Sequence, residues 1–267
     1  MFIDIHSHIL PGLDDGASTT DEALAMASLA VADGVAAIIA TPHVYPGLYE
    51  NSRQTIEDAV FRLRAELSNA GLALELLAGA EYFLEPGLLG RLTPGDLLFL
   101  HRDSRSLLVE FPALQVPAYA ESVLHELFLG GIRPVIAHPE RNPELAGSDL
   151  LERLVHRGAL LQVTAASLCG YLGRTARQAA EDLLKRGIVH LVASDAHSCR
   201  GRSPQLSAAR QRAAEMLGES AARQLFSENP RRLLQGGDVL PVSCQGRSRA
   251  TGGWWRRVFC FLNNRGK

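Results

Sequence analysis

The chain has 267 residues, of which 46% are hydrophobic, 21% charged and 6% aromatic, with a formal net charge of −2 at pH 7. This composition excludes collagen-like, coiled-coil and largely disordered classes, and the length suits one sizeable core. The apolar runs fall far short of the ~20 residues of a membrane-spanning helix. The N-terminus carries Asp4, His6 and His8 where a signal peptide would need a basic and then an apolar region. We therefore expect a cytoplasmic globular protein.

Short apolar segments recur along the chain, separated by helical patterns. Helix start signals occur at residues 18–20 and 51–52, and glycines end the first two helices at Gly34 and Gly71. The alternation predicts an α/β fold with a parallel sheet and helical crossovers. At this length a closed or nearly closed barrel is favoured, with an open doubly wound sheet as the alternative. The predicted strands are residues 2–5, 36–40, 74–80, 107–111, 134–137, 160–163 and 188–193.

The periodic pattern ends near Gly237, which predicts one domain over residues 1–240 and a tail over residues 241–267. The tail has six basic residues and no acidic one, so it carries +6 and the rest of the chain −8. An acidic body argues against nucleic-acid binding, which needs a basic surface to replace counterions. In the tail, Trp254 and Trp255 precede two arginines, a pattern typical of an interfacial membrane anchor. A disordered tail or a packing patch for another subunit is the alternative.

Nearly every predicted strand ends in a side chain that can bind a metal ion, the strand at 160–163 being the exception. The carboxyl ends of parallel strands form one rim, so we expect these side chains to converge. Side chains two residues apart in an extended segment share a face. The pairs His6 with His8 and Asp195 with His197 can therefore each address one ion. The strand-end side chains are His6, His8, His43, Glu81, Glu110, His138, Asp195 and His197.

Other polar residues have simpler explanations. Asp14 and Asp15 precede Gly16 and could form an ordinary turn, an explanation that fits Asp14 better than Asp15. We expect no metal role for four further histidines in loops, helices or a strand start. These are His101, His125, His156 and His190.

Six motifs together resemble a known family. They span residues 4–16, 40–43, 79–81, 109–112, 137–141 and 194–197, in the order DIHSHILPGLDDG, ATPH, GAE, VEFP, AHPER and SDAH. These segments look like the successive motifs of the polymerase and histidinol phosphatase (PHP) superfamily. The closest match is its branch of manganese-dependent bacterial protein tyrosine phosphatases, which act in capsule and exopolysaccharide synthesis. The resemblance covers about residues 1–236.

The resemblance implies a distorted seven-stranded, TIM-like barrel that holds three divalent metal ions. Imidazole and carboxylate ligands suit Mn²⁺, Fe²⁺ or Zn²⁺, and the preference for manganese rests on the resemblance. Three such ions and four carboxylates leave a charge of about +2, which suits a phosphate dianion. By the family pattern the first ion is held by His6, His8, Glu81 and Asp195, the second by Glu81, Glu110 and His138, and the third by Asp15, His43 and His197.

The same resemblance implies a protein-tyrosine phosphatase in which a metal-bridged hydroxide attacks phosphorus. Arg141 and Arg202 match the family's phosphate-binding arginines. Ser203 stands where the family usually has proline directly after arginine, and Arg200 could substitute for Arg202. The implied substrate is a phosphotyrosine protein, in particular a membrane-associated bacterial tyrosine kinase that controls capsule synthesis. A membrane-proximal cytoplasmic location would suit that substrate.

Three other functions compete with this interpretation. A cysteine phosphatase needs a C-x5-R motif, but Cys169 is one residue too close to Arg174, and Cys199 is closer still to Arg202. No cysteines form a C-x-x-C pair, and we expect free thiols. A phosphoesterase on histidinol phosphate or nucleic acid would keep the metal ligands, as would a non-catalytic metal-binding regulator. The Asp-Asp-Gly motif favours the tyrosine branch.

Overall fold

A parallel sheet of three strands forms the N-terminal part of the fold. In the computed structural model, which describes residues 1–92, 95–101 and 105–242, β1 pairs with β2 and β2 with β4. The side chains of Thr19 and Ser52 accept backbone hydrogen bonds at the starts of the two connecting helices, as the capping signals predict. These elements are β1 (Phe2–Ser7), α1 (Thr20–Ala32), β2 (Val35–Ala40), α2 (Arg53–Asn69) and β4 (Glu75–Ala78).

A second parallel sheet holds the remaining strands, in the order β3-β5-β6-β7-β8-β9. Each strand here pairs with the next in sequence, so the crossovers all run the same way around the molecule. All seven predicted strand segments are therefore confirmed as parallel strands. The strands are β3 (His43–Val44), β5 (Glu81–Phe83), β6 (Ser106–Glu110), β7 (Arg133–Ala137), β8 (Leu160–Thr164) and β9 (Leu191–Ala193).

Two chain segments pass from the first sheet into the second. After a short break β2 leads into β3, and β4 leads into β5. Gly79 lies at the second break, where its N–H donates to Ala40 O at 2.9 Å. A Cβ atom on Gly79 would come 2.7 Å from Ile39 Cγ2, so this close approach requires glycine. At this break the chain passes from the first sheet to the second, and Glu81 begins β5 at the end of the fold where the candidate metal ligands gather.

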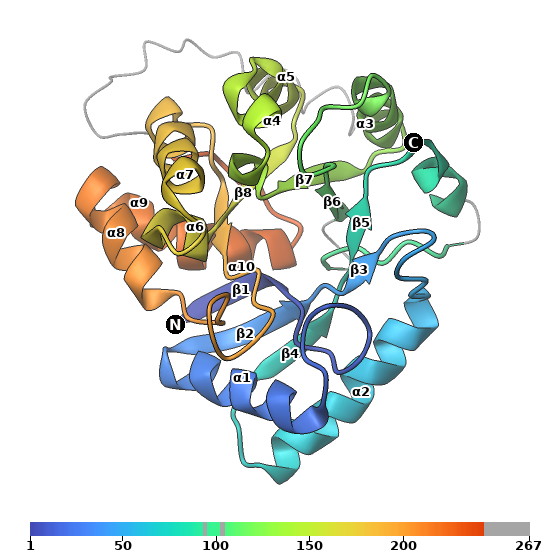
Figure 1. Cartoon of the computed structure of the whole chain (residues 1–267), viewed down its shortest axis with the longest axis vertical. Helices are drawn as coiled ribbons and strands as arrows, with labels where there is room; N and C mark the ends of the chain where they lie inside the picture. The colour runs from blue at the N-terminus through green and yellow to red at the C-terminus, as the bar shows by residue number, and fades with distance from the viewer. Residues whose placement is uncertain (93–94, 102–104, 243–267) are drawn as a thin grey trace, which may run out of the picture.

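The two sheets also meet where β1 ends. Ser7 forms a parallel bridge with Ala196, His8 N–H donates to Ala196 O at 2.8 Å, and Asp195 N–H donates to His6 O at 2.9 Å. Figure 1 shows the strands in the middle of the molecule with the helices around them. The α/β class with parallel strands is confirmed. Within the described ranges the strands form two sheets, and a single closed sheet is not found.

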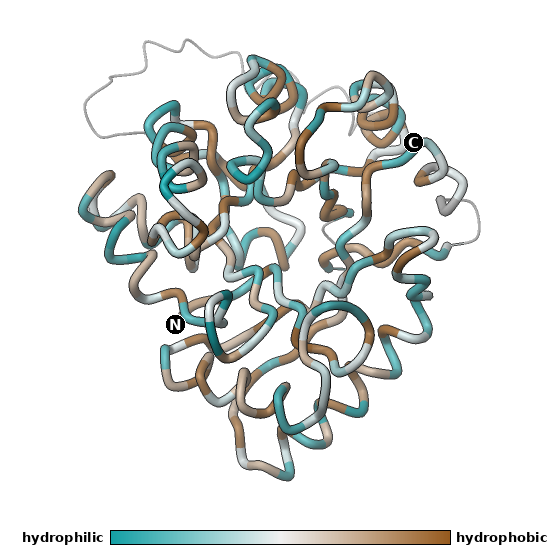
Figure 2. Tube along the Cα trace, in the orientation of Figure 1, coloured by the Kyte–Doolittle hydropathy of each residue, from teal (hydrophilic) through white to brown (hydrophobic). Residues whose placement is uncertain are grey.

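Helices cover the outside of the strands. Along an outer helix such as α2, hydrophobic residues recur between hydrophilic ones (Figure 2), and the buried residues of this helix are all hydrophobic. In the part of the chain that the structure describes, no helix is long and apolar enough to cross a membrane. The remaining helical elements are η1 (Pro86–Leu92), α3 (Ala120–Leu129), η2 (Pro139–Arg141), α4 (Pro143–Gly147), α5 (Leu150–His156), α6 (Ala165–Cys169), α7 (Arg174–Arg186), α8 (Ser207–Leu217), α9 (Glu219–Arg223), η3 (Gln224–Glu228) and α10 (Asn229–Leu234).

Apolar side chains form two buried clusters. The larger one joins the strands to the surrounding helices and includes Met26 of α1 and Leu63 of α2. The smaller one gathers side chains from β1, β2, β6, β7, β8 and β9, and none from α1 to α7. It also includes Leu233 of α10, and it therefore lies on the strand faces that point away from helices α1 to α7. Ile5, Leu108 and Leu191 are fully buried members of this inner cluster.

Candidate metal centre

The strand-end side chains lie directly beyond the inner apolar cluster. On β6, Glu110 follows Leu108 on the same face of the strand, and beyond β9, Asp195 follows Ala193. The structure brings all nine sequence-predicted metal ligands together, in four overlapping groups whose candidate ligand atoms lie within 4.8 Å of one another. These groups are His8, Asp15, His43 and His197; His6, His8 and Glu81; His6, His138 and Asp195; and His43, Glu81 and Glu110.

Glu81 lies at the middle of these groups and is almost completely buried. Its Oε2 atom is 3.3 Å from His6 Nε2, 3.4 Å from His8 Nε2 and 3.0 Å from His43 Nδ1. Its Oε1 atom is 2.9 Å from His138 Nε2. One carboxylate thus faces three imidazoles from two parts of the chain with one oxygen and a fourth imidazole with the other. A carboxylate that bridges two metal ions needs this arrangement.

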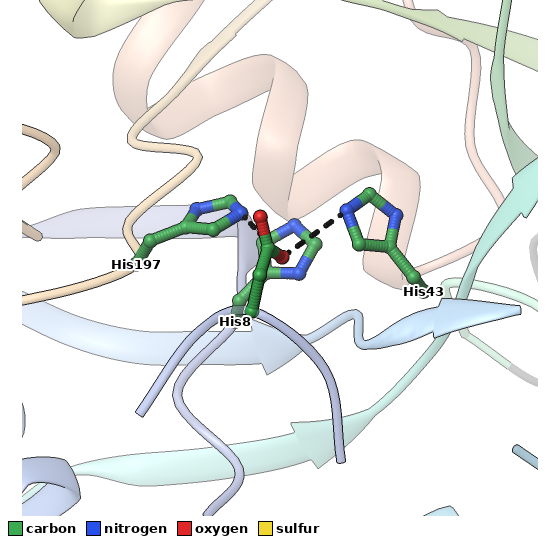
Figure 3. Close-up of side chains that lie close together, drawn as sticks. His8, His43 and His197 are labelled. Atoms are coloured by element: carbon green, nitrogen blue, oxygen red, sulfur yellow. Dashed lines mark ion pairs between the residues drawn. The ribbon is translucent and has the colours of Figure 1, made fainter. Parts of the chain in front are cut away.

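Asp15 forms a second focus at the edge of the cluster. Its Oδ1 atom is 3.2 Å from His197 Nε2 and 3.4 Å from His43 Nε2. Figure 3 shows the imidazoles of His8, His43 and His197 arriving from three separate segments, with dashed lines for the ion pairs. The ring centroids of His8 and His197 are 3.9 Å apart. Asp15 is half-exposed, so this side of the cluster opens toward solvent.

Asp195 joins the imidazoles to two arginines. Its Oδ1 atom is 3.5 Å from both His6 Nε2 and His8 Nε2. Its Oδ2 atom accepts hydrogen bonds from Arg141 Nη1 at 2.6 Å and from Arg202 Nη1 at 3.2 Å. Both predicted phosphate-binding arginines therefore lie beside the cluster and point their guanidinium groups at the same oxygen.

Arg200 occupies a different position. It is exposed, and its backbone N–H and carbonyl form hydrogen bonds with the Ser198 hydroxyl. Arg202 also approaches Asp15, at 3.6 Å between Nη2 and Oδ2. Of the two arginines in this loop, Arg202 is the one whose side chain reaches the cluster.

Two residues of the cluster have left-handed backbone conformations that side chains other than glycine rarely adopt. The φ angle is +31° at His138 and +52° at Asp195. Such strain persists only when surrounding contacts enforce it, and it is common at functional sites. The turn after His138 is held by Arg141 N–H, which donates to His138 O at 3.0 Å, and by Glu140, which accepts a hydrogen bond from Thr164 N–H at 2.9 Å.

Asp14 orients the cluster without being among its candidate ligands. His8 Nδ1 donates to Asp14 Oδ2 at 2.7 Å, and the backbone N–H of His43 donates to the same oxygen at 2.9 Å. Gly16 N–H donates to Asp14 Oδ1 at 2.9 Å, so the turn interpretation of Asp14 is also correct. A Cβ atom on Gly16 would come 2.0 Å from His8 O, and the loop can lie this close only with glycine.

Gln162 of β8 plays the same part for His6. Its Oε1 atom accepts a hydrogen bond from His6 Nδ1 at 2.9 Å. With both Nδ1 atoms donating, the Nε2 atoms of His6 and His8 face each other with lone pairs, 3.1 Å apart. A shared cation stabilises such a pair. Sequence reasoning missed both orienting side chains, although Gln162 is the one polar residue in an otherwise apolar predicted strand.

Unpaired polar atoms support a metal centre. Glu81 Oε2, Asp195 Oδ1 and His197 Nε2 are buried and make no hydrogen bond within the described ranges of the chain. Buried polar atoms without hydrogen bonds are costly, and a bound cation would satisfy all three. Imidazole nitrogens and carboxylate oxygens without a thiolate suit divalent transition metals. The residues present therefore fit the metal ions that the sequence motifs imply.

Burial and neighbouring charges shift the pKa values of the cluster in opposite directions. Burial and the nearby charge of Glu81 raise the pKa of Glu110 to about 7. Burial and the positive charge of Arg141 lower the pKa of His138 to about 4. Burial opposes protonation of His8, but its hydrogen bond to Asp14 and its ion pair with Glu81 prevail and raise its pKa to about 9. These shifts apply to the metal-free cluster, in which protons take part of the role of cations.

Four other histidines and two described cysteines are the remaining candidate side chains. Within the described residues, His101, His125, His156 and His190 belong to none of the four ligand groups. Cys169 and Cys199 are free thiols, and burial raises the pKa of each. Cys244 and Cys260 lie outside the described residues.

The fold and the cluster together define an α/β protein with a candidate metal centre at the carboxyl ends of its strands. The sequence profile of the family described as capsular polysaccharide synthesis, CpsB/CapC, matches residues 2–235, so the chain belongs to the CpsB/CapC family. This membership confirms the resemblance inferred from the six motifs.

Similar proteins include two that are named tyrosine-protein phosphatases. Tyrosine-protein phosphatase YwqE of Bacillus subtilis (strain 168) is 40% identical over 202 residues, which cover 75% of this chain and 79% of the relative. Tyrosine-protein phosphatase CpsB of Streptococcus pneumoniae is 30% identical over 238 residues, covering 87% and 98%. A solved structure from work on YwqE and CpsB as "unique metal-dependent tyrosine phosphatases" matches with a TM-score of 0.84 and 36% identity. It covers 92% of this chain and 100% of the other.

Proposed function

We propose that the chain is a metal-dependent protein-tyrosine phosphatase that hydrolyses the phosphate monoester of phosphotyrosine. The proposal rests on one observation: nine candidate metal ligands and two arginines lie together at the carboxyl ends of the strands. Relatives named tyrosine-protein phosphatases, at 40% and 30% identity, support the choice of phosphotyrosine as substrate. A non-catalytic metal-binding regulator would need no arginine pair beside the ligands.

The cluster would hold three divalent ions, with manganese as the expected metal and Fe²⁺ or Zn²⁺ as alternatives. When bound, such ions lower the pKa of a coordinated water so that it can attack phosphorus at neutral pH. The four overlapping ligand groups support more than one ion. In this assignment His6, His8, Glu81 and Asp195 hold the first ion, Glu81, Glu110 and His138 the second, and Asp15, His43 and His197 the third.

Arg141 and Arg202 would bind the oxygens of the phosphoryl group. Both guanidinium groups are anchored on Asp195 Oδ2, so their positions are fixed relative to the ligand cluster. Charge-assisted hydrogen bonds from two arginines stabilise negative charge as it develops on the transferring group. Arg200 is exposed, and it would also contact the bound substrate protein.

The fold would act as one distorted seven-stranded barrel. The two sheets share chain segments at the β2 to β3 and β4 to β5 breaks. The Ser7 to Ala196 bridge joins the carboxyl end of β1 to the segment after β9. These connections support a continuous wall of strands around the inner apolar cluster, with the metal ligands at its open end.

The physiological substrate would be a phosphoprotein of capsule synthesis, specifically a membrane-associated bacterial tyrosine kinase. The family description supports a role in capsular polysaccharide synthesis.

We also propose residues 1–240 as the catalytic domain and residues 241–267 as a basic, aromatic tail that contacts the membrane from the cytoplasmic side. The aromatic and basic residues of this proposed tail fall within residues 243–267, which lie outside the described residues. Co-sedimentation with anionic vesicles, comparing the full chain with one ending at residue 240, tests it. Equal binding by both would rule out the anchor.

A metal analysis of the purified protein, paired with substrate assays, tests the proposed activity. A phosphotyrosine peptide, histidinol phosphate and DNA should be compared at equal concentrations. We expect the phosphotyrosine peptide to be hydrolysed with the highest kcat/KM. Preference for histidinol phosphate would move the chain to the small-molecule phosphoesterases. Cys169→Ser and Cys199→Ser should leave the rate largely unchanged, because neither thiol is the nucleophile.

A further inference from the structure

Aromatic side chains line one side of the candidate metal centre. Tyr45 and Phe83 stack face to face, with ring centroids 3.9 Å apart and ring planes within 6° of parallel. Tyr49 stacks on the imidazole of His43, at 5.5 Å between centroids and 12° between planes. All three aromatic residues are half-buried. We call Tyr45, Tyr49 and Phe83 the aromatic wall.

Strand register explains why the aromatic wall lies at the metal centre. In the β3 and β5 ladder, His43 pairs with Glu81, and Phe83 pairs across the other edge of β5 with Glu110. Side chains two residues apart in a strand share a face. Phe83 therefore shares the face of Glu81, and Tyr45 shares that of His43. The two rings stand one step beyond the metal ligands, toward the open end of the strands.

The segment from Tyr45 to Tyr49 is a preformed turn. Tyr45 N–H donates to Tyr49 O at 3.0 Å, and Tyr49 N–H donates to Tyr45 O at 2.8 Å. Gly47 has a φ of +82° and its N–H donates to Glu50 Oε1 at 2.7 Å. These hydrogen bonds hold the two tyrosines on the same short loop. Binding against a preformed surface loses less conformational entropy than binding that must order it.

The arginines come from other strands than the aromatic wall. Arg141 follows β7 and Arg202 follows β9, and both are anchored on Asp195. The wall comes from β3 and β5. The centre thus has cationic groups suited to a phosphate at one part of its rim and aromatic rings at another, with the candidate metal ligands between them.

We propose that the aromatic wall binds the phenyl ring of phosphotyrosine and so selects aryl phosphates over alkyl phosphates. This inference rests on the proposed phosphatase function and names the residues that set its specificity. Stacked or edge-to-face aromatic pairs add stabilisation beyond the area they bury. A phosphoserine side chain or a small alkyl phosphate has no ring to offer and would gain none of it.

Steady-state kinetics of the holoenzyme test the proposal. Tyr45→Leu and Tyr49→Leu should each raise KM for a phosphotyrosine peptide by about 3- to 10-fold, the range expected for loss of one aromatic contact. We expect kcat and the rate on β-glycerophosphate, an alkyl monoester, to stay within about two-fold, because the wall stabilises ground and transition states alike. Tyr45→Phe and Tyr49→Phe keep the rings and should retain the aryl preference. Tyr171→Leu, which removes a tyrosine that is 71% exposed elsewhere, is the matched control.

A second measurement needs no variant. On the wild-type holoenzyme, phenylphosphonate should inhibit more strongly than methylphosphonate. Equal inhibition by the two would overturn the proposal, as would an equal loss of activity on aryl and alkyl substrates in the leucine variants. Loss of metal from Tyr49→Leu, with unchanged KM in Tyr45→Leu, would assign the rings to holding His43 and also overturn it. A wild-type enzyme inactive on phosphotyrosine would instead overturn the proposed function.

Discussion

The inner faces of the strands differ between their two ends. Leu108 on β6 and Leu160 on β8 belong to the inner apolar cluster, and two residues later the same faces carry Glu110 and Gln162. The apolar end is stable by packing alone. The polar end concentrates buried carboxylates and imidazoles, whose desolvation is costly unless each is paired or bound to a cation. One row of side chains thus supplies folding stability at its start and binding chemistry at its end.

The polar end is balanced by mutual charge. Burial opposes ionisation of Asp195, but the imidazoles of His6 and His138 and the Arg141 guanidinium hold its pKa below the usual range. Close contacts with the imidazoles of His197 and His43 lower the pKa of Asp15. Removing one member of the polar end should therefore affect its neighbours, whereas a cavity at the apolar end should stay local.

Arg141 and His138 are close in sequence but should fail in different ways. Arg141→Ala should leave the metal content unchanged and lower kcat/KM on a phosphotyrosine peptide by about 10²- to 10³-fold, because it removes a charge-assisted contact to the transferring phosphoryl group. His138→Ala should reduce the number of ions bound per chain. Metal analysis and kinetics on both variants separate the two roles. Equal metal loss in both would show that the arginine belongs to the metal site.

Leu108→Ala breaks the apolar end of β6. The free energy of unfolding should fall by about 2–5 kcal/mol, because the substitution leaves a cavity among fully buried neighbours. Metal content and kcat should change little well below the melting temperature. Denaturant unfolding and metal analysis check this together. A large loss of metal without a loss of stability would mean that the two ends are not separable.

Asp14→Asn weakens a contact that orients the polar end. Metal affinity or activity should drop by about 10- to 100-fold, the usual cost of losing the carboxylate behind a metal-bound histidine. The fold should persist, since the asparagine can still accept the hydrogen bond from Gly16 N–H. A metal titration followed by activity measures the effect. Unchanged affinity would indicate that Asp14 serves only the turn.

The buried His190, which is not among the candidate metal ligands, should make the free energy of unfolding depend on pH. Burial and the charge of Arg133 lower its pKa from 6.5 to about 3, while its Nδ1 accepts a hydrogen bond from Leu161 N–H at 3.1 Å. Between these two pH values the unfolded chain binds a proton that the folded protein excludes. The free energy of unfolding should therefore fall as pH drops below 6.5, by about 1.4 kcal/mol at pH 5.5 from this group.

His190→Asn should remove that part of the pH dependence. The exposed His156→Asn serves as the control, because it should leave the pH profile of wild type intact. Denaturant unfolding at pH 7.5 and pH 5.5 gives the comparison. Identical slopes for wild type and His190→Asn would show that His190 is not held neutral by the fold.

Local sequence patterns predict the longer strands and the convergence of the candidate ligands, but not the short strands β3 and β5. Apolar runs of strand length predict all seven strand segments, and polar residues at their ends predict the convergence at one rim, because parallel strands share a carboxyl edge. The break at Gly79 was not predictable, since it depends on the approach of Ile39 from a neighbouring strand. The strand predicted over residues 74–80 is confirmed as β4, which ends at Ala78, and the separate strand β5 begins beyond the break, at Glu81, in the other sheet.

The orienting side chains needed the structure for a similar reason. Asp14 accepts hydrogen bonds from a local turn, from the His8 imidazole and from the backbone N–H of His43, and only the turn is visible in sequence. Gln162 lies 156 residues from its partner His6. The stacking of Tyr45 on Phe83 likewise depends on strand register, which spacing along the chain does not determine. What sequence reasoning missed is the set of contacts between strands that are not neighbours in the chain.

Removal and return of metal test directly whether hydrolysis depends on bound metal ions. The holoenzyme should be treated with a chelator, analysed for bound metal, and assayed on a phosphotyrosine peptide before and after addition of Mn²⁺. Phosphatase activity should disappear as the ions leave and return as they rebind, because only bound ions make water a nucleophile at neutral pH. Full activity in protein shown to be metal-free would contradict it.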